Sequence, residues 1–369
     1  MKLKKDFHPR MLGFAGFSGS GKTTLIEKII IEMSEYRIGY IKHDAHRFSL
    51  DHEGKDTYRQ YQAGAQAVFI NDPEHYALQV RGESFTLEKE FFKDCDVVLV
   101  EGHKYSDHPK FLFLDDEGMA EKEFHAGKIT GVIGTISLKE PIRKIDNLPA
   151  FHRDDVKCLI SFILEKMKDS KEETLLQGLI LAGGRSSRMG EDKALLNYHG
   201  IPQAKYLHET LETLNIKSFI SCRDDQLTRE GLEELPVITD RFIDFGPLGG
   251  ILSAMSRYPN KAWIVIACDL PFVTAGKIAD LISERDALKQ ATAFFNEERK
   301  QFEPLFAIYE PGIYSRMLHF LGEGVQCPQK VLFNSSIKKL RLETQGFLEN
   351  ANTPDERTKI LRTMGGLSL

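Results

Sequence analysis

The first residues whose types and spacing indicate chemistry are 16–23, which read GFSGSGKT and match the pattern G-x-x-x-x-G-K-[ST]. Glycines at these positions let backbone N–H groups turn toward phosphate oxygens, and a helix starting behind the loop adds a favourable dipole. We expect Lys22 to reach the β- and γ-phosphates of a nucleotide and the Thr23 hydroxyl to hold Mg²⁺. The alternative is a flexible Gly/Ser turn. The residues predicted to bind this nucleotide are Gly16, Ser18, Gly19, Ser20, Gly21, Lys22, Thr23 and Thr24.

A loop of this kind requires an acidic partner at the end of a neighbouring strand, where it can orient water around the magnesium ion. Residues 96–102 read DVVLVEG, so that either Glu101 or Asp96 could supply the carboxylate. We predict Glu101, together with Thr23, as the metal residues of this half. Buried strands that end in Glu-Gly also occur without a catalytic role.

The segment between the loop and this strand is rich in histidine and acidic residues. Residues 42–56 read KHDAHRFSLDHEGKD. Such a composition is typical either of a metal site or of a solvated polar loop that faces phosphates. No N-K-x-D motif, which reads guanine in many GTPases, follows in this half, so the residues leave the base undetermined.

A second glycine-rich loop follows an apolar run at 175–181. Residues 181–193 read LAGGRSSRMGEDK. The glycine pair allows the backbone to approach a nucleoside and its α-phosphate closely. We expect Arg188 and Lys193 to place positive charge on pyrophosphate, the leaving group when a phosphate nucleophile attacks the α-phosphorus. A basic surface loop is the alternative.

Asp269 is the predicted metal residue of the second half. It ends the apolar run 263–268, and ligands of open α/β sheets bind at the carboxyl ends of the strands. Its carboxylate is a hard oxygen ligand of the kind that Mg²⁺ prefers. Alternatively, Asp269 caps a following helix, although a helix with Pro271 at its first position would be capped by Leu270.

Two further segments of this half are candidates for ligand contacts. Asp240 ends the run PVITD and could accept a hydrogen bond from a ribose or base. The loop FGPLGG at 245–250 could form the wall beside the ribose, or it could equally be a plain turn. Near the C-terminus, Pro354 is expected at the first position of a helix capped by Thr353. Capping leaves Asn350 and Asn352 available for another role.

These residues need strands and helices to position them, and the pattern of the chain is α/β throughout. Short β-branched runs alternate with longer helical patterns, and both glycine loops lie between a strand-like run and a helical one. The polar stretch 168–174 has no periodicity and is typical of a linker. A length of 369 residues corresponds to two or three domains at about 150 residues each. We therefore predict domains at 1–170 and 171–369.

Composition restricts the class of protein. The net charge is −5, which gives no support for nucleic-acid binding, and 41% of the residues are apolar, which argues against disorder. The five cysteines form no C-x-x-C pair, so that neither a disulfide framework nor a cysteine zinc site is expected. The apolar runs are too short to cross a bilayer, and the N-terminus does not read as a signal peptide. We expect a cytoplasmic protein with no membrane partner.

The first half resembles a known family. The P-loop, the segments IKHDAHRF and GKDTYRQYQAGA, and the segment DVVLVEGHKYSDHPK are together similar to the MobB family over residues 10–167. This resemblance implies a GTP-binding P-loop adaptor domain of molybdenum cofactor maturation. It leaves open whether the domain hydrolyses GTP, as a GTPase switch or a P-loop kinase would turn over nucleotide.

The second half resembles the MobA family of molybdenum cofactor guanylyltransferases over residues 176–365. The segments that carry the resemblance are LAGGRSSRMGEDKALL, VITD, GPLGG, ACDLP, EPLFAIY and NANTPDE. The chain departs from the family at 221–223, where it reads Ser-Cys-Arg and the family commonly has asparagine. The resemblance implies Mg²⁺ on Asp269 and a nucleotide on Leu181, Ala182, Gly183, Gly184, Lys193, Asp240 and Asp269.

Together the two resemblances imply a fusion of two doubly wound α/β domains, a P-loop NTPase-like domain and a Rossmann-like nucleotidyltransferase domain. The implied reaction joins GMP from GTP to the phosphate of molybdopterin, with Lys193, Arg188 and Asp269 as catalytic residues and Mg²⁺ as cofactor. Implied partners are GTP, molybdopterin or molybdenum-molybdopterin, other cofactor biosynthesis proteins and molybdoenzymes. The alternative is a cytidylyl- or sugar-phosphate nucleotidyltransferase. The pair Gly183-Gly184 resembles the guanine enzymes more than the cytosine enzymes.

Overall fold

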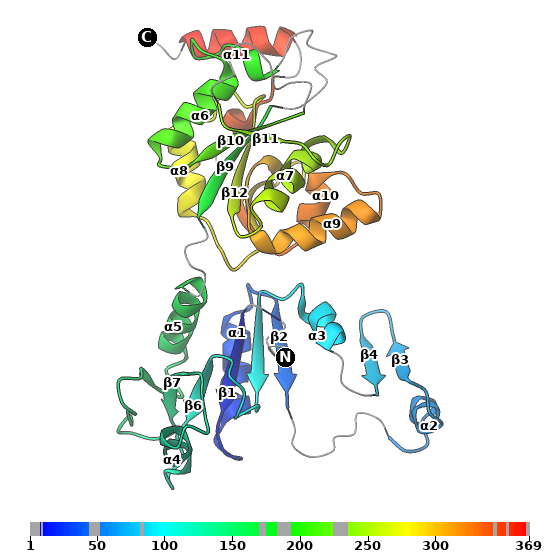
Figure 1. The fold of residues 1–369 in the computed structure, drawn as a ribbon, viewed down its shortest axis with the longest axis vertical. Coiled ribbons are helices and arrows are strands. Elements are labelled where there is room, and N and C mark those ends of the chain that lie inside the picture. Colours follow the sequence, from blue (N-terminus) through cyan, green and yellow to red (C-terminus); the bar gives the residue numbers. More distant parts are fainter. Residues whose placement is uncertain are drawn as a thin grey trace. The chain divides into compact units, whose positions relative to one another are not determined.

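The computed structural model describes residues 8, 10–43, 52–81, 85–169, 175–182, 193–223, 235–341, 345–351 and 354–366. The chain forms two compact units, Met1–Glu165 and Lys166–Leu369, each with a sheet of its own (Figure 1). The domain boundary expected between residues 170 and 171 lies outside the described residues and stays a prediction. Among the described helices, none is long and apolar enough to cross a membrane.

The first unit is built on a six-stranded parallel sheet whose order is β2-β5-β1-β6-β7-β8. All five residues of β5 are buried, as expected for a strand with neighbours on both sides and cover on both faces. Because the strands are parallel, their carboxyl ends meet at one edge of the sheet. The strands are β1 (Met11–Ala15), β2 (Ile38–Lys42), β5 (Val97–Glu101), β6 (Lys110–Phe113), β7 (Val132–Ser137) and β8 (Ala150–His152).

Helices and a separate hairpin complete this unit. Helix α1 buries Leu25, Ile26 and Ile29, and α5 places Phe162 against the rings of Phe111 and Phe151. The hairpin of β3 (Ala67–Asn71) and β4 (Tyr76–Val80) forms a two-stranded sheet of its own, drawn beside α2 in Figure 1. The helices are α1 (Lys22–Glu32), α2 (Asp56–Gln62), α3 (Phe85–Phe92), α4 (Met119–His125) and α5 (Val156–Asp169).

The second unit is built on a seven-stranded mixed sheet in the order β11-β10-β9-β12-β14-β13-β15. Strands β9 to β12 are parallel, whereas β14 runs antiparallel to both of its neighbours. The chain passes from β9 to one side and then returns to β12 on the other, so the sheet has a switch point at β9. The strands are β9 (Leu176–Leu181), β10 (Ser218–Cys222), β11 (Val237–Thr239), β12 (Ala262–Ala267), β13 (Ala291–Asn296), β14 (Gln301–Tyr309) and β15 (Ile337–Arg341).

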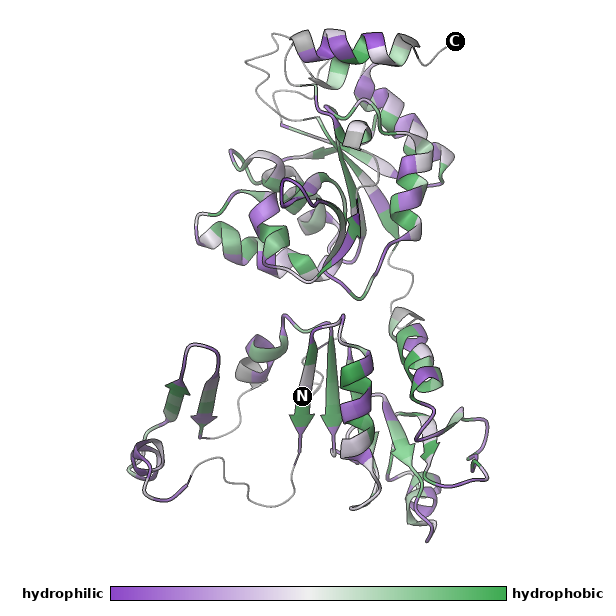
Figure 2. Cartoon of the chain, turned by 180° about the vertical axis from the view of Figure 1, so that it is seen from behind, coloured by the Kyte–Doolittle hydropathy of each residue, from purple (hydrophilic) through white to green (hydrophobic). Residues whose placement is uncertain are grey.

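Apolar residues cover both faces of this second sheet. On β12, Ile264 and Ile266 belong to one buried cluster, while Trp263 and Val265 belong to another. This alternation follows from the two-residue period of a strand. The first cluster includes residues of α6 and α8, and the second includes residues of α7, α9 and α10. Figure 2 shows the apolar residues concentrated along the strands of both units. The predicted doubly wound α/β class is therefore confirmed for both halves.

The helices of the second unit are short. The 3₁₀ segments are η1 (Lys193–Leu195), η3 (Pro311–Ile313) and η4 (Gln345–Leu348), and the α-helices are α6 (Gln203–Thr213), α7 (Gly246–Arg257), α8 (Ala275–Ser283), α9 (Tyr314–Gly322), α10 (Pro328–Phe333) and α11 (Pro354–Gly366). The expected helix start at Pro354 is confirmed, while Thr353 and Asn352 lie outside the described residues.

Candidate functional site

The first candidate site is the loop that joins β1 to α1. Gly19 and Gly21 have φ values of 77° and 74°, a region that favours glycine, and Gly21 directly precedes α1. The Lys22 ammonium donates to the carbonyl of Phe17 at 2.7 Å and to the hydroxyl of Ser20 at 3.0 Å. Burial lowers its pKa. All eight predicted residues, 16 and 18–24, lie in this loop or in the first turn of α1, and their contact with a nucleotide stays a prediction.

Glu101 is the acidic residue next to this loop, and Asp96 is not. Glu101 ends β5 beside β1, and its carboxylate oxygens accept from the Thr23 hydroxyl at 2.9 and 3.1 Å. Asp96 precedes β5 at the opposite edge of the sheet, where its carboxylate accepts from the backbone N–H of Arg37. Of the two carboxylates that the sequence left open, only Glu101 can act with Thr23.

Tyr40 is a third member of this group that the sequence did not reveal. Its hydroxyl donates to Glu101 Oε2 at 2.7 Å from the neighbouring strand β2. Burial, the hydrogen bond and the negative charge of Glu101 raise the pKa of Tyr40, so the phenol stays protonated. An aromatic residue in an apolar strand carries no signal for this role, because the contact depends on the pairing of β2 with β5.

The histidine-rich segment 42–56 is described only in part, because residues 44–51 lie outside the described range. Within the described part, His43 follows β2 and its ring stacks on that of His103, which follows β5, with 3.9 Å between the centroids. In the parts of the chain that the structure describes, no group of three or more His, Cys, Asp and Glu side chains could hold a metal ion. The metal-site interpretation of this segment gains no support there.

The second candidate site lies at the carboxyl ends of β9 and β12. Leu181 ends β9 and Ala182 follows it, both buried. The predicted residues Gly183, Gly184 and Arg188 lie outside the described range. Lys193 begins η1, but its side chain is outside the described set. The role of this loop therefore stays a prediction.

Asp269 follows β12 in a turn that belongs to no helix. The next helix, α8, begins at Ala275, and its cap is Thr274, whose hydroxyl accepts from the N–H of Lys277. The alternative that Asp269 caps a following helix is therefore wrong, and Pro271 is not the first residue of that helix. The reason is that residues 268–274 form turns before the helix begins.

Glu303 lies close enough to Asp269 for the two carboxylates to interact. Burial raises the pKa of Glu303, and the negative charge of Asp269 raises it further, against a hydrogen bond from the backbone N–H of Leu305. Glu303 belongs to β14, which pairs antiparallel with β12. The motif EPLFAIY contains this residue, but only the pairing of the strands brings it to Asp269.

Asp240 and Ser221 form the third element of this edge. The Ser221 hydroxyl, at the end of β10, donates to Asp240 Oδ1 at 2.6 Å. Burial raises the pKa of Asp240, while this hydrogen bond and Arg223 oppose the rise. A Cβ at Gly250 would lie 2.4 Å from Ser221 Oγ, so glycine is required for α7 to approach β10. Ser221, which belongs to the segment 221–223 where the sequence departs from the family, therefore positions a predicted nucleotide contact.

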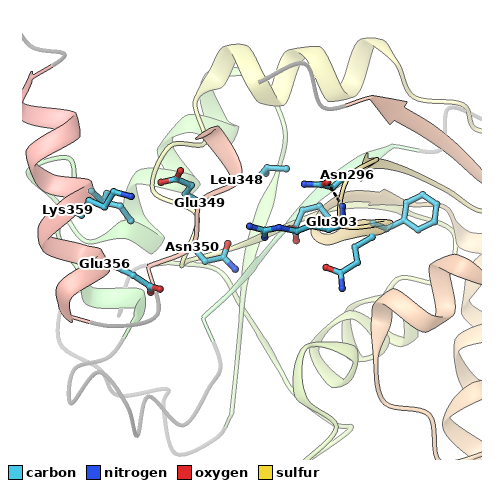
Figure 3. Close-up of a pocket in the computed structure, with 11 residues that line it drawn as sticks. Asn296, Glu303, Leu348, Glu349, Asn350, Glu356 and Lys359 are labelled. Atoms are coloured by element: carbon cyan, nitrogen blue, oxygen red, sulfur yellow. Dashed lines mark hydrogen bonds between the residues drawn. The ribbon is translucent and has the colours of Figure 1, made fainter. Parts of the chain in front are cut away.

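A cavity of about 480 Å³ opens beside Glu303. Figure 3 shows Asn296 and Glu303 on one side, the segment that carries Asn350 in the middle, and Glu356 and Lys359 of α11 opposite. Arg299 also lines the cavity. The walls are mainly polar and carry both signs of charge. Sequence reasoning left Asn350 available but did not identify this cavity.

Both sites contain oxygen donors that fit Mg²⁺. In the first unit they are the hydroxyl of Thr23 and the carboxylate of Glu101, held together by hydrogen bonds. In the second unit they are the carboxylates of Asp269 and Glu303, whose mutual repulsion a divalent cation would relieve. Mg²⁺ usually takes one or two protein carboxylates and completes its coordination with phosphate and water. The oxygen donors of each site are therefore sufficient to bind Mg²⁺ together with phosphate and water.

Two family models match the chain. Residues 11–136 match the family described as molybdopterin guanine dinucleotide synthesis protein B, MobB. Residues 178–338 match the family described as a MobA-like NTP transferase domain. The two matches do not overlap, and they correspond to the two units of the structure.

The chain is also similar to individual proteins with related names. The chain is 33% identical over 193 residues to a molybdenum cofactor biosynthesis bifunctional protein of Synechocystis, covering 52% of this chain and 56% of that one. It is 32% identical over 186 residues to a molybdenum cofactor guanylyltransferase of Yersinia pseudotuberculosis, and the match covers 48% of this chain and 91% of that protein. The crystal structure of Bacillus subtilis MobB is 31% identical, with coverage of 41% and 96% and a TM-score of 0.35. The chain thus spans about half the length of the Synechocystis relative.

Proposed function

Because the chain belongs to the molybdenum cofactor guanylyltransferase family, with a MobB domain ahead of its MobA-like NTP transferase domain, we propose that it transfers GMP from GTP to molybdopterin. An oxygen of the terminal phosphate of molybdopterin, with or without bound molybdenum, attacks the α-phosphorus of GTP. The bond from that phosphorus to the β-phosphate oxygen breaks, and pyrophosphate leaves with the electron pair. The products are the guanine dinucleotide cofactor and pyrophosphate.

The observation that carries this proposal is the pair of carboxylates at the end of β12. Asp269 lies outside any helix, and its negative charge acts on Glu303 of β14. Mg²⁺ bound there would neutralise charge that develops on the α-phosphate and the leaving group. Asp269 would hold the ion, and the chain's own contribution is to keep this carboxylate at the switch point of the sheet. The attacking phosphate is already ionised at neutral pH, so the reaction needs no protein nucleophile.

The remaining residues of the site have roles in binding and orientation. Lys193 and Arg188 would place positive charge on pyrophosphate as it forms. Asp240, held by Ser221, would accept a hydrogen bond from the nucleoside. Leu181 and Ala182, with Gly183 and Gly184, would bring the backbone close to the nucleotide.

The cavity beside Glu303 suits the acceptor. Its volume of about 480 Å³ is that of an ordinary small-molecule site. Arg299 and Lys359 supply cations for a phosphate group, and Asn350 supplies amide donors and acceptors for a heterocycle. We therefore assign molybdopterin to this cavity, with its phosphate toward Asp269.

For the first domain we propose GTP binding without a large contribution to transfer. Its loop would cradle the phosphates, with Lys22 on the β- and γ-phosphates and Mg²⁺ held by Thr23 and Glu101. The domain would act as an adapter between the transferase and other cofactor biosynthesis proteins or molybdoenzymes. Tight binding of GTP with little hydrolysis would agree with this role, whereas rapid turnover would indicate a GTPase or a kinase.

The proposal is tested by measuring pyrophosphate release from the full chain with Mg²⁺, molybdopterin and each nucleoside triphosphate in turn. We expect release with GTP and a loss of about 100-fold or more in Asp269→Ala. Asp280→Ala, an exposed aspartate of α8, is the matched control and should retain the rate. Release with CTP instead of GTP would overturn the base assignment, and release with none of the nucleotides would overturn the transfer reaction.

A further inference from the structure

The turn after β12 is fixed by three hydrogen bonds to three successive backbone carbonyls. The carbonyl of Asp269 accepts from the N–H of Ala351 at 3.0 Å. The carbonyl of Leu270 accepts from Gln203 Nε2 at 3.4 Å, and that of Pro271 accepts from His199 Nε2 at 2.9 Å. Helix α8 begins only at Ala275, so these three donors hold the turn together with its own backbone hydrogen bonds, from the N–H of Leu270 to the carbonyl of Ala267 and from that of Val273 to the carbonyl of Leu270.

The two side-chain donors of this set come from one segment. Gln203 is the first residue of α6 and is fully buried. His199 lies four residues earlier, and its ring stacks on Tyr206 of the same helix, with 3.6 Å between the centroids and 9° between the planes. The stacking restricts the rotation of the imidazole, so that Nε2 faces the Pro271 carbonyl. A carbonyl can only accept, so this nitrogen carries the proton.

We propose that His199, assisted by Gln203, is a positioning residue for Asp269. By donating to consecutive carbonyls of the turn, the two side chains hold the Asp269 carboxylate where it meets Mg²⁺ and the nucleotide phosphates. Residues that orient a metal-binding carboxylate typically influence metal affinity strongly without touching the metal themselves. This inference rests on the proposed function, because it assigns the purpose of the turn to metal binding by Asp269.

A comparison of His199 with a second histidine, His208, supports this assignment over a purely structural role. His208 of the same helix also makes a side-chain hydrogen bond, to Ser218 Oγ at 2.7 Å. Ser218 begins β10, at the edge of the sheet opposite to that of Asp269. His208 therefore contributes to packing of α6 alone, whereas His199 acts on the turn that carries the metal residue. The two histidines form a matched pair for experiment.

The variants distinguish the effect of the His199 hydrogen-bond donor from that of its aromatic ring. His199→Phe keeps an aromatic ring that can stack on Tyr206 but removes the donor. His199→Gln keeps an N–H donor near the position of Nε2 but removes the ring. Gln203→Met removes the second donor with little change of volume and provides an independent measurement if His199→Phe does not fold. His208→Phe is the control.

The measurement is the equilibrium binding of α,β-methylene-GTP as a function of Mg²⁺ concentration, in full-length protein that carries Lys22→Ala to suppress nucleotide binding by the first domain. We expect His199→Phe to raise the Mg²⁺ concentration at half-saturation by about 10-fold or more, and Gln203→Met to raise it in the same direction. His199→Gln should stay within about threefold of the parent, and His208→Phe should equal it. Binding of the analogue without Mg²⁺ should be the same in all of them.

The inference is overturned if His199→Phe and Gln203→Met keep the parental Mg²⁺ requirement, or if His199→Gln is impaired as much as His199→Phe. Asp269→Ala in the same titration separates this failure from that of the proposed function. If Asp269→Ala abolishes the effect of Mg²⁺ while the His199 variants do not, only the positioning role fails. If Asp269→Ala retains the Mg²⁺ effect, the metal assignment of the proposed function fails, and the inference with it.

Discussion

At the scale of single residues, the hydroxyl of Tyr40 shows how a side chain outside the P-loop motif can orient the carboxylate that lies beside it. Glu101 receives hydrogen bonds from Thr23 on one side and from Tyr40 on the other. A carboxylate held at both oxygens has one orientation toward the metal position beside Thr23. Because the pKa of Tyr40 is raised, its hydroxyl keeps the proton that it donates to Glu101.

Tyr40→Phe is therefore expected to raise the Mg²⁺ concentration needed for GTP binding by the first domain, by about threefold to 10-fold. The change removes one hydrogen bond from a phenol that is itself partly exposed to solvent, so we expect the lower part of that range. Mg²⁺ titrations of GTP binding in an Asp269→Ala background measure the effect. Tyr76→Phe, on the hairpin of β3 and β4, is the matched control. An unchanged Mg²⁺ requirement in Tyr40→Phe would contradict the role.

Glu303 gives a prediction about pH. Burial and the charge of Asp269 raise its pKa in the folded protein, so the ionised form of Glu303 destabilises the fold. Below the pKa of an unfolded glutamate, about 4.3, Glu303 is protonated and costs the protein no stability compared with a neutral side chain. As the pH rises through the higher pKa of Glu303 in the folded protein, this stability is lost. Glu303→Gln should consequently raise the unfolding temperature at pH 7 but not at pH 4.

Thermal unfolding at the two pH values tests this. We expect a gain of about 2–4 °C at pH 7, the shift that about 1 kcal/mol causes in a domain of this size. Glu297→Gln, an exposed glutamate whose pKa is lowered by hydrogen bonds from Lys300, should show no such gain. The same Glu303→Gln protein is expected to lose transferase activity. A lower unfolding temperature at pH 7 would show that Glu303 is stabilised as the carboxylate.

At the scale of elements, the close approach of α7 to the sheet determines the position of Ser221 and Asp240, the proposed nucleoside contacts. A Cβ at Gly250 would lie 2.4 Å from Ser221 Oγ and 2.9 Å from Leu181 Cδ2. Gly250→Ala is therefore expected to destabilise the second unit by about 1–3 kcal/mol and to weaken the Ser221–Asp240 hydrogen bond. Gly276 of α8 is the contrasting position, since the nearest atom to its Cβ is Thr274 Oγ1 at 3.9 Å.

Urea unfolding of the two variants checks this contrast. Gly276→Ala should stabilise the unit by up to about 1 kcal/mol, because alanine favours the helix and restricts the unfolded chain. The KM for GTP in pyrophosphate release should rise in Gly250→Ala and remain unchanged in Gly276→Ala. Equal effects of the two substitutions on stability would contradict the close contact between α7 and β10.

The elements also explain how much the sequence could predict. Buried parallel strands are continuous apolar runs, so β1, β5, β9 and β12 and the residues at their ends were readable from the sequence. The hairpin of β3 and β4 was not expected as a unit, because its strands do not join the main sheet. Contacts that depend on which strands pair, such as those of Tyr40 and Glu303, have no local signal. The alternative that Asp269 caps a helix fails for the same reason, since the side chains of His199 and Gln203, which bind the carbonyls of this turn, come from elsewhere in the chain.

At the scale of the whole molecule, the chain contains two predicted phosphate-binding loops, which follow strands of two separate sheets. Each unit has its own core, and in the sequence the two predicted loops directly follow β1 of the first sheet and β9 of the second. Two such sites on one chain predict about two nucleotides per molecule, each lost independently of the other when its own site is removed.

Lys22→Ala should reduce the stoichiometry of GTP binding from about two to about one, because it removes the ammonium group that the first loop positions for the phosphates. Calorimetric titration of the full chain with Mg²⁺ and GTP, in the absence of molybdopterin, measures this number. Lys28→Ala provides the control, since Lys28 lies on the same helix but forms an exposed ion pair with Asp154 at 2.9 Å. That variant should still bind about two nucleotides. A stoichiometry of about one in the unmodified chain would mean that only one of the two loops binds GTP, and the response to Lys22→Ala would identify which one.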